Sequence, residues 1–328
     1  MKETGMFFRC YLALLLILTS LSYSQSDEEA IREIFEKTTG TKTFSLTVIP
    51  IKEGLTNRNY KVIVNGAPFF VRLGHKDPQS LRIDRVKERA LYTLAEKAGI
   101  APRLLYSDTD AGNLVAPFIQ GTAYGKKGGH WLYERKSSIQ RIATLLRRYH
   151  RNAAPQDPKI DYPFQIIDDY IQEAHTLLIC LPKDMDRALE IVQRLKAHTL
   201  QQKKVLCHQD LVPDNFIFDE KTLYLVDWEY AEWSNPYYDL ASICIEHGFD
   251  EEEKRMLLGA YFRRSTEKRR CVLEMMCMLY SMRDCLWYIL ENRRSPHEGG
   301  DFLQLANEHY QNFFTSLRWL EDHHISLM

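Results

Sequence analysis

The 328-residue sequence lacks an excess of basic charge: 43 Lys and Arg residues stand against 44 Asp and Glu residues, giving a formal net charge of −1. A protein that neutralises many phosphates needs an excess of Lys and Arg, so this balance argues against a broad nucleic-acid-binding surface. Local basic clusters at residues 141–151 and 263–270 have helical spacing, which is typical of solvent-exposed helix faces. We therefore expect no nucleic-acid partner.

The sequence also lacks a Cys-x-x-Cys pair, although it contains seven cysteines. An odd number of cysteines scattered among apolar residues indicates reduced, buried thiols rather than a disulfide framework or a zinc site. Reduced thiols favour a reducing compartment, so we expect the catalytic part of the chain to be cytoplasmic.

Residues 1–25 disagree with that expectation. An apolar run at residues 10–21 follows two basic residues and precedes small polar ones, which resembles the apolar core of a secretory signal peptide. The run is short for a membrane-spanning helix, which needs ~20 apolar residues. The segment is interpreted as a cleaved signal, a weak anchor or an upstream extension, and membrane association is expected only through residues 7–24.

The remainder of the chain has neither an internal repeat nor a low-complexity tract. Residues 27–121 read as a small antiparallel sheet with a helix before it and another inserted in it. Residues 122–328 are dominated by helical patterns, at 139–150, 164–178, 184–200, 251–264 and 272–292. Strand-like runs occur there only within residues 205–228. These patterns predict an α+β fold with a small β-rich N-terminal lobe and a larger helical C-terminal lobe.

Polar residues with a catalytic spacing lie between the short strand-like runs. His208, Asp210 and Asn215 match H-x-D-x-x-x-x-N, the spacing of a kinase catalytic loop, and Asp227 follows at the end of an apolar run. Asp210 can accept the proton of an attacking hydroxyl, and Asn215 and Asp227 offer the hard oxygen ligands that Mg²⁺ prefers. Asp210 and His208 are therefore the candidate catalytic residues, and Asn215 and Asp227 the candidate metal ligands.

The alternative is a β-turn rich in Asp and Pro, whose carboxylates accept hydrogen bonds from nearby amides. The strand-like run that ends in Asp227, and the sheet-rich segment that precedes the motif, favour the catalytic interpretation. A short hairpin between Asn215 and Asp227 would bring their oxygens together across a polyphosphate.

Two signatures of nucleotide-binding proteins are missing. The sequence has no G-x-G-x-x-G loop and no P-loop, and Asp227 is followed by Trp228 and Glu229 rather than by Phe and Gly. The sequence therefore does not match a protein kinase in detail.

The sequence instead resembles the choline/ethanolamine kinase family, close to its bacterial LicA-like members and related to the aminoglycoside phosphotransferases of the protein kinase-like superfamily. The segments that carry the resemblance are GLTNRNYKV (54–62), FVRLG (70–74), IDRVKE (83–88), GIAPRLLY (99–106), CHQDLVPDNFI (207–217), LVDWEYA (225–231) and NPYYDLA (235–241). They cover roughly residues 30–290 in the expected order. The resemblance implies a two-lobe, protein kinase-like fold and a phosphotransferase that uses ATP and Mg²⁺.

The resemblance also implies roles for residues of the N-terminal, nucleotide-binding lobe. Thr56, Asn57 and Asn59 lie where a loop would cover the nucleotide phosphates. Arg72 occupies the place of the ATP-binding Lys, and Glu88 would hold it in position. The alternatives are an exposed strand residue for Arg72 and a solvated helix face for Glu88.

Two further carboxylates follow the motif. Glu229 would point the same way as Asp227 if the strand continues, which makes it a possible second metal ligand. Asp239 is expected to cap a helix that starts near Leu240 and to brace the catalytic loop.

The acceptor is expected in the C-terminal lobe, where aromatic and acidic residues can hold a cation. Tyr230, Trp287 and Glu246 would form a cage of π-faces and one carboxylate, suited to a quaternary ammonium. In the family that the chain resembles, Trp287 fits one aromatic of this cage, but Asp284 stands where a second Trp is common. The first choice of acceptor is choline, and ethanolamine, thiamine and an amino-sugar stay open.

Two function classes remain. The first is an ATP- and Mg²⁺-dependent kinase for a small amino alcohol, and the second is a non-catalytic kinase-fold protein that binds a small cation or a nucleotide. The presence of Asp210, Asn215 and Asp227 favours the kinase. The sequence does not set the oligomeric state.

Overall fold

The computed structural model describes residues 25–51, 57–74, 82–123, 135–152, 162–199, 204–294 and 301–325. The chain divides into two compact units, of which the first comprises Met1–Arg82 and Arg103–Phe118 and the second Ile83–Pro102 and Ile119–Met328. The predicted lobes, 27–121 and 122–328, stay a prediction. The inserted helix groups with the second unit rather than with the sheet.

The first unit contains a five-stranded antiparallel sheet in the order β1-β2-β3-β5-β4. Its elements are α2 (Gln25–Thr39), β1 (Leu46–Ile51), β2 (Arg58–Val64), β3 (Ala67–Leu73), β4 (Tyr106–Asp108) and β5 (Asn113–Pro117). Asn65 and Gly66 join β2 to β3 with positive φ at both positions, 48° and 84°. A two-residue turn of that kind matches the twist of the strands it connects.

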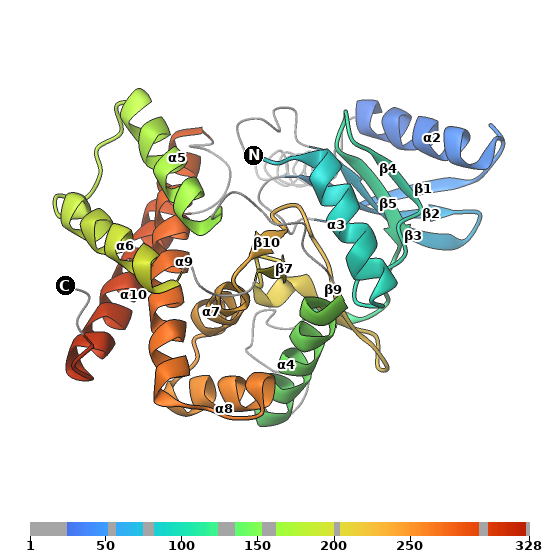
Figure 1. The fold of residues 1–328 in the computed structure, drawn as a ribbon. Coiled ribbons are helices and arrows are strands. Elements are labelled where there is room, and N and C mark those ends of the chain that lie inside the picture. Colours follow the sequence, from blue (N-terminus) through green and yellow to red (C-terminus); the bar gives the residue numbers. More distant parts are fainter. Residues whose placement is uncertain are drawn as a thin grey trace, which may run out of the picture. The chain divides into compact units, whose positions relative to one another are not determined.

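Helix α2 covers the sheet with one apolar side. Ile31, Ile34 and Phe35 are buried in one cluster with Val62 of β2 and Val71 of β3. Figure 1 shows α2 beside this sheet. Their spacing of three and four residues places them on one face of the helix, and burial of that face stabilises the unit.

The second unit is mainly helical, as the sequence patterns predict. Its helices are α3 (Arg85–Lys97), α4 (Arg135–Asn152), α5 (Tyr162–Thr176), α6 (Met185–Thr199), α7 (Pro236–Glu246), α8 (Glu251–Phe262), α9 (Glu267–Arg294) and α10 (Phe302–Asp322). The long helix α9 runs beside α10 and also contacts α5, α6 and α7 (Figure 1). Because neighbours cover α9 on several sides, most of its residues from Arg270 to Glu291 are buried, charged ones among them, and the helix shows little amphipathic pattern. The sequence patterns do not predict α10.

Within the described part of this unit, five short strands and a 3-10 turn lie among the helices. They are β6 (Thr122–Ala123), β7 (Val205–Cys207), η1 (Pro213–Asn215), β8 (Phe216–Phe218), β9 (Leu223–Leu225) and β10 (Glu232–Ser234). Strand β7 pairs with β10, and β8 pairs with β6 and β9. The predicted α+β class is thereby confirmed.

The described cysteines are free thiols, and all but Cys180 are buried. Cys180 is exposed because it lies in the loop after α5, so the prediction of a buried thiol is wrong there. The predicted signal-like segment lies, except for its last residue, outside the described residues. Within the described ranges, no helix has both the length and the apolar character needed to cross a bilayer.

Candidate active site

The loop that follows β7 is held by the buried carboxylate of Asp239. One oxygen of Asp239 accepts a hydrogen bond from the His208 amide at 3.0 Å, and the other from the Gln209 amide at 2.9 Å. Tyr149 and His150 also hydrogen-bond to this carboxylate, His150 at 3.0 Å. Burial alone would raise the pKa of Asp239, but these hydrogen bonds hold it below its usual value. The prediction that Asp239 braces the loop is confirmed.

The predicted capping role of Asp239 is wrong. Helix α7 begins at Pro236, and its N-cap is Asn235, whose side-chain oxygen accepts a hydrogen bond from the Tyr237 amide at 3.0 Å. Asp239 therefore lies inside the first turn, where its carboxylate reaches the neighbouring loop rather than its own helix end.

His208 is completely buried under the loop. Its Nε2 contacts the Val226 carbonyl at 2.9 Å, and its Nδ1 accepts a hydrogen bond from the Asp210 amide at 3.3 Å. Burial lowers the pKa of His208 to about 4, so the ring is neutral at neutral pH. The backbone engages both nitrogens, an arrangement that fits a residue that positions Asp210. The catalytic role of His208 stays a prediction.

Asp210 is half-buried and is held by Asn215. The Asn215 side-chain amide donates to the Asp210 carbonyl at 2.9 Å and to its carboxylate at 3.2 Å. Burial raises the pKa of Asp210 to about 6, the negative charges of Asp284 and Glu229 add to the rise, and Arg283 opposes it. A carboxylate with a pKa near neutrality is suited to accept a proton from a hydroxyl.

The β8–β9 hairpin brings Asn215 and Asp227 to the same end of two paired strands. Phe216 pairs with Leu225, and the Val226 amide donates to the Asn215 carbonyl at 2.9 Å. Asp227 has a φ of 64°, so the chain turns at this residue. An amide oxygen and a carboxylate at one hairpin end are a donor set that fits Mg²⁺.

Glu229 does not lie on a continued strand. Strand β9 ends at Leu225, so the expectation that the strand continues and directs Glu229 to the same side as Asp227 is wrong. Glu229 is buried, and Arg85 of α3 donates to it at 3.1 Å and to Glu88 at 2.8 Å. A buried carboxylate needs such a partner. The role of Glu229 as a metal ligand stays a prediction.

Arg72 lies in the middle of the first unit's sheet. It is 5% exposed, which excludes the alternative of an exposed strand residue. Its Nε donates to the Gly112 carbonyl at 3.3 Å. In the antiparallel pair of β2 with β3, Arg72 lies opposite Asn59. The sheet therefore places two of the predicted nucleotide-binding residues side by side.

The other predicted nucleotide contacts stay predictions. Asn57 lies directly before β2, and Thr56 lies outside the described residues. Glu88 is 4% exposed, so it is not on a solvated helix face. The predicted pair of Glu88 with Arg72 joins residues of the two units and stays a prediction.

The predicted acceptor residues all belong to the second unit. The Tyr230 hydroxyl lies near the Trp287 indole, and neither polar atom makes a well-formed hydrogen bond with a described residue although both are buried. Glu246, at the end of α7, accepts a hydrogen bond from the Tyr280 hydroxyl at 3.0 Å. Burial raises the pKa of Glu246 to about 8, and the charges of Asp284 and Asp210 add to the rise. Glu246 therefore lies close to the catalytic loop.

Sequence patterns missed two contributors to this region. Arg283 of α9 donates to the Gln209 carbonyl at 2.9 Å and forms an ion pair with Asp284 at 2.5 Å. The only sequence signal is an Arg-Asp pair inside the otherwise uncharged run of residues 275–290. His309 of α10 lies 3.7 Å from Glu246, and nothing in the local sequence marks it.

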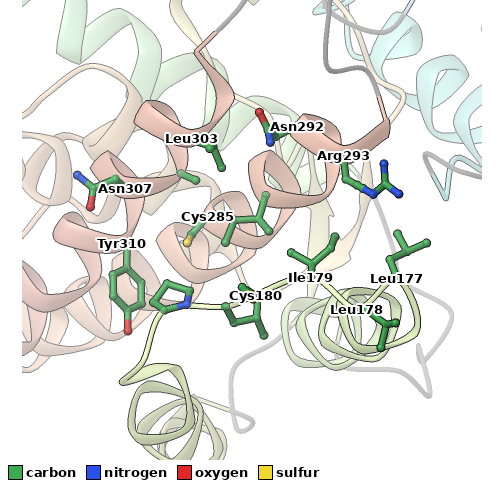
Figure 2. A pocket seen from close by; sticks show the side chains of 14 residues that line it. Leu177, Leu178, Ile179, Cys180, Cys285, Asn292, Arg293, Leu303, Asn307 and Tyr310 are labelled. Carbon is green, nitrogen blue, oxygen red and sulfur yellow. The ribbon is translucent and has the colours of Figure 1, made fainter.

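A pocket of about 480 Å³ lies elsewhere in the second unit, between the loop after α5 and helices α9 and α10. Figure 2 shows Leu177, Leu178 and Ile179 of the loop across from Asn292 and Arg293 of α9. Its lining contains neither a carboxylate nor any of the predicted site residues, so it is not the candidate active site.

A carboxylate on a braced loop, followed by a hairpin whose end carries an amide and a carboxylate, is an arrangement compatible with a kinase-type phosphotransferase. The sequence matches the phosphotransferase enzyme family over residues 47–273. The chain belongs to this family, which confirms the predicted enzyme class at the level of the family.

Individual relatives agree with this membership. Protein LicA of Haemophilus influenzae is 22% identical over 213 residues, which are 63% of this chain and 60% of that protein's length. The crystal structure of choline kinase LicA from Streptococcus pneumoniae has a TM-score of 0.70 at 22% identity and covers 91% of this chain and all of that one. A structure of LicA in complex with AMP has a TM-score of 0.68 at 21% identity, covering 88% and 98%. These structures confirm the predicted protein kinase-like fold.

Proposed function

We propose that the chain is an ATP- and Mg²⁺-dependent phosphotransferase that acts on the hydroxyl group of a small cationic amino alcohol. The observation that carries the proposal is the position of Asp210, on a loop fixed by Asp239 and hydrogen-bonded to Asn215. Family membership and the AMP complex of a structural neighbour support the use of a nucleotide.

Each residue of the loop and hairpin has a role in this proposal. Asp210 orients the acceptor hydroxyl and takes its proton, while His208 and Asp239 keep the loop in place. Asn215 and Asp227 hold Mg²⁺, with Glu229 as a weaker candidate. When bound, Mg²⁺ neutralises the charge of the transferring phosphoryl group.

The first unit is assigned to the nucleotide. Thr56, Asn57 and Asn59 would contact the phosphates, and Arg72, held by Glu88, would fork across phosphate oxygens. We place the catalytic part of the chain in the cytoplasm, because a kinase needs ATP and the described cysteines are free thiols.

Choline is the first acceptor to test, because a structural neighbour is a choline kinase and because Tyr230, Trp287 and Glu246 provide aromatic rings and a carboxylate. Ethanolamine is the second candidate, favoured by the additional carboxylate of Asp284. Thiamine and aminoglycosides are less favoured. A non-catalytic kinase-fold protein is disfavoured because Asp210, Asn215 and Asp227 are all present.

The test uses the full chain with ATP and Mg²⁺ and measures ADP release with choline, ethanolamine, thiamine or an aminoglycoside. We expect release that depends on an amino alcohol and exceeds the rate without acceptor. An absence of acceptor-dependent ADP release throughout this panel contradicts the kinase proposal.

A further inference from the structure

The two basic clusters of the sequence come together in the second unit, because helices α4 and α8 pack against each other (Figure 1). The first turns of the two helices meet where Arg135 donates a hydrogen bond to Glu253 at 3.0 Å. Their last turns meet where His150 contacts the Tyr261 hydroxyl at 2.6 Å, although these two residues are 111 positions apart. The helices therefore run in the same direction and end beside each other.

A pocket of about 280 Å³ lies between the ends of α4 and α8 and the start of β7. It is lined by Arg147 and Arg151 of α4, by Arg263 directly after α8, and by His150, Tyr261 and two apolar residues. Among the described residues, no Asp or Glu belongs to this lining. The pocket is smaller than the ~300–1,000 Å³ that drug-sized ligands occupy, so it suits a small negatively charged group.

The three guanidinium groups at the pocket have no acidic partner in the part of the chain that the structure describes. Arg147 donates to the Thr144 hydroxyl at 3.2 Å, and neither Arg151 nor Arg263 forms an ion pair there. Arg147 and Arg151 lie four residues apart on one helix, where like charges destabilise each other. A bound anion removes this repulsion, which identifies the charge of the ligand.

Arg263 lies after α8 in a left-handed backbone conformation, with a φ of 63°. Gly is the usual residue in that conformation, because the Cβ of any other residue crowds the backbone. An Arg accepts this crowding at an energetic cost. What it adds over Gly is a guanidinium group at the pocket.

One wall of the pocket is fixed by hydrogen bonds. His150 Nδ1 contacts the Tyr261 hydroxyl, and its Nε2 lies 3.0 Å from the Asp239 carboxylate. Burial raises the pKa of Tyr261, and the positive charge of Arg151 opposes the rise, so this guanidinium lies near the phenol. Both nitrogens of His150 are occupied, which leaves the recognition of a ligand to the three arginines.

The ends of α4 and α8 oppose the binding of an anion only weakly. A helix carries about half a negative elementary charge at its C-terminal end. The three full positive charges of the arginines outweigh two such ends. Guanidinium groups also present forked N–H donors that match the oxygens of a phosphate group.

We propose that Arg147, Arg151 and Arg263 form a phosphate-binding site, for inorganic phosphate or for the phosphate group of a small phosphomonoester. The pocket lining contains none of the residues proposed to hold the nucleotide, Mg²⁺ or the acceptor, so the site is separate from the candidate active site. The inference goes beyond the proposed kinase function and does not depend on it.

The test titrates the full chain with inorganic phosphate at constant ionic strength and measures the Kd by calorimetry. Arg147→Gln removes a charged hydrogen-bond donor, so the Kd should rise about tenfold or more. Arg148→Gln is the matched control, because Arg148 is an exposed residue of the same helix outside the pocket lining. It should leave the Kd unchanged, and an equal loss of affinity in the two variants overturns the inference.

Arg263→Gly separates a ligand-binding role from a structural one. Gly adopts the left-handed conformation without strain, so the unfolding temperature in the absence of phosphate should stay the same or rise. The Kd for phosphate should nevertheless rise about tenfold. Unaltered phosphate affinity in this variant overturns the site, and a lower unfolding temperature then assigns Arg263 to stabilisation of the helix end.

Two further titrations identify and locate the ligand. Glycerol phosphate that binds more tightly than inorganic phosphate identifies a phosphomonoester, weaker binding identifies free phosphate, and no binding of either probe overturns the site. Arg72→Gln tests the proposed nucleotide site, and a rise in Kd there, with none in Arg147→Gln, also overturns the inference. These titrations need no turnover, so their failure leaves the kinase proposal standing, and failure of the kinase proposal leaves the phosphate site standing.

Discussion

At the loop that follows β7, both carboxylate oxygens of Asp239 from α7 accept backbone hydrogen bonds, and both ring nitrogens of His208 contact the backbone. In the acceptor region, the Tyr230 hydroxyl, the Trp287 indole and His309 Nδ1 are buried without well-formed hydrogen bonds to described residues. The backbone amides at the start of the loop and the ring of His208 thus find partners within the protein, whereas the buried side-chain amide of Gln209 has none among the described residues. The residues proposed for the acceptor keep unused polar groups, and a buried polar group gains most from a partner that arrives with a ligand.

The largest effect, a fall in kcat, is expected when Asp210 of the loop is replaced. Asp210→Ala removes the proton acceptor, so kcat should fall by at least about 10²–10⁴-fold while ATP binding is retained. Steady-state kinetics and nucleotide titration measure the two quantities separately. Loss of ATP binding with unaltered turnover per bound nucleotide contradicts the role given to Asp210.

The next largest effect is expected on stability, when the Asp239 carboxylate that holds the loop is removed. Asp239→Ala leaves the amides of His208 and Gln209, and the side chains of Tyr149 and His150, without their shared acceptor. The free energy of unfolding should fall by about 3–5 kcal/mol, measured by denaturant titration. Asp239→Asn keeps one oxygen acceptor and should lose less; equal losses in the two variants argue against the hydrogen-bonding explanation.

The end of the β8–β9 hairpin that carries Asn215 and Asp227 is expected to set the Mg²⁺ concentration that activity requires. Asp227→Asn removes a charged ligand, so the Mg²⁺ concentration for half-maximal activity should rise by about tenfold or more. Asp219→Asn changes an acid at the opposite end of the same hairpin, where its carboxylate accepts amide hydrogen bonds from Lys221 and Thr222. This control should leave the Mg²⁺ requirement unchanged, and a similar rise in both variants contradicts the assignment.

The smallest expected effect is a shift in pH dependence that links the two regions. Asp210 acts as a base only when ionised, and burial raises its pKa to about 6, so kcat/KM should fall as the pH drops through about 6. The charge of Asp284 raises this pKa, while Arg283 and Asn215 lower it. Asp284→Asn should therefore move the midpoint of the pH–rate profile to lower pH. A midpoint that stays or rises contradicts the coupling.

Several elements were predictable because they depend on nearby residues. The spacing from His208 to Asn215 and the strand pattern before Asp227 predicted the hairpin, and β8 and β9 form it. The Asn65–Gly66 turn likewise depends only on the two residues that form it. Turn chemistry and alternation act over a few residues, so the sequence pattern contains them.

Other features were missed or misassigned because their partners are distant in sequence. Glu229 was expected beside Asp227 but pairs with Arg85, 144 residues away. The partner of His208 Nε2 is the Val226 carbonyl, 18 residues away. Asp239 was expected at a helix start, yet Asn235 takes that place. Local spacing cannot specify which remote side chain will meet a buried charge.

The sequence by itself determined most of the order of helices and strands, though not β6, β10 or α10, and the set of catalytic and metal-binding candidates, because periodicity and motif spacing are properties of short segments. Only the tertiary structure decided the partners of those groups. Asp239 from α7 fixes the loop, Arg283 from α9 reaches Gln209, and His309 from α10 lies 3.7 Å from Glu246. Those contacts form when burial of apolar helix faces brings distant segments together, and burial then requires each polar group to find a partner.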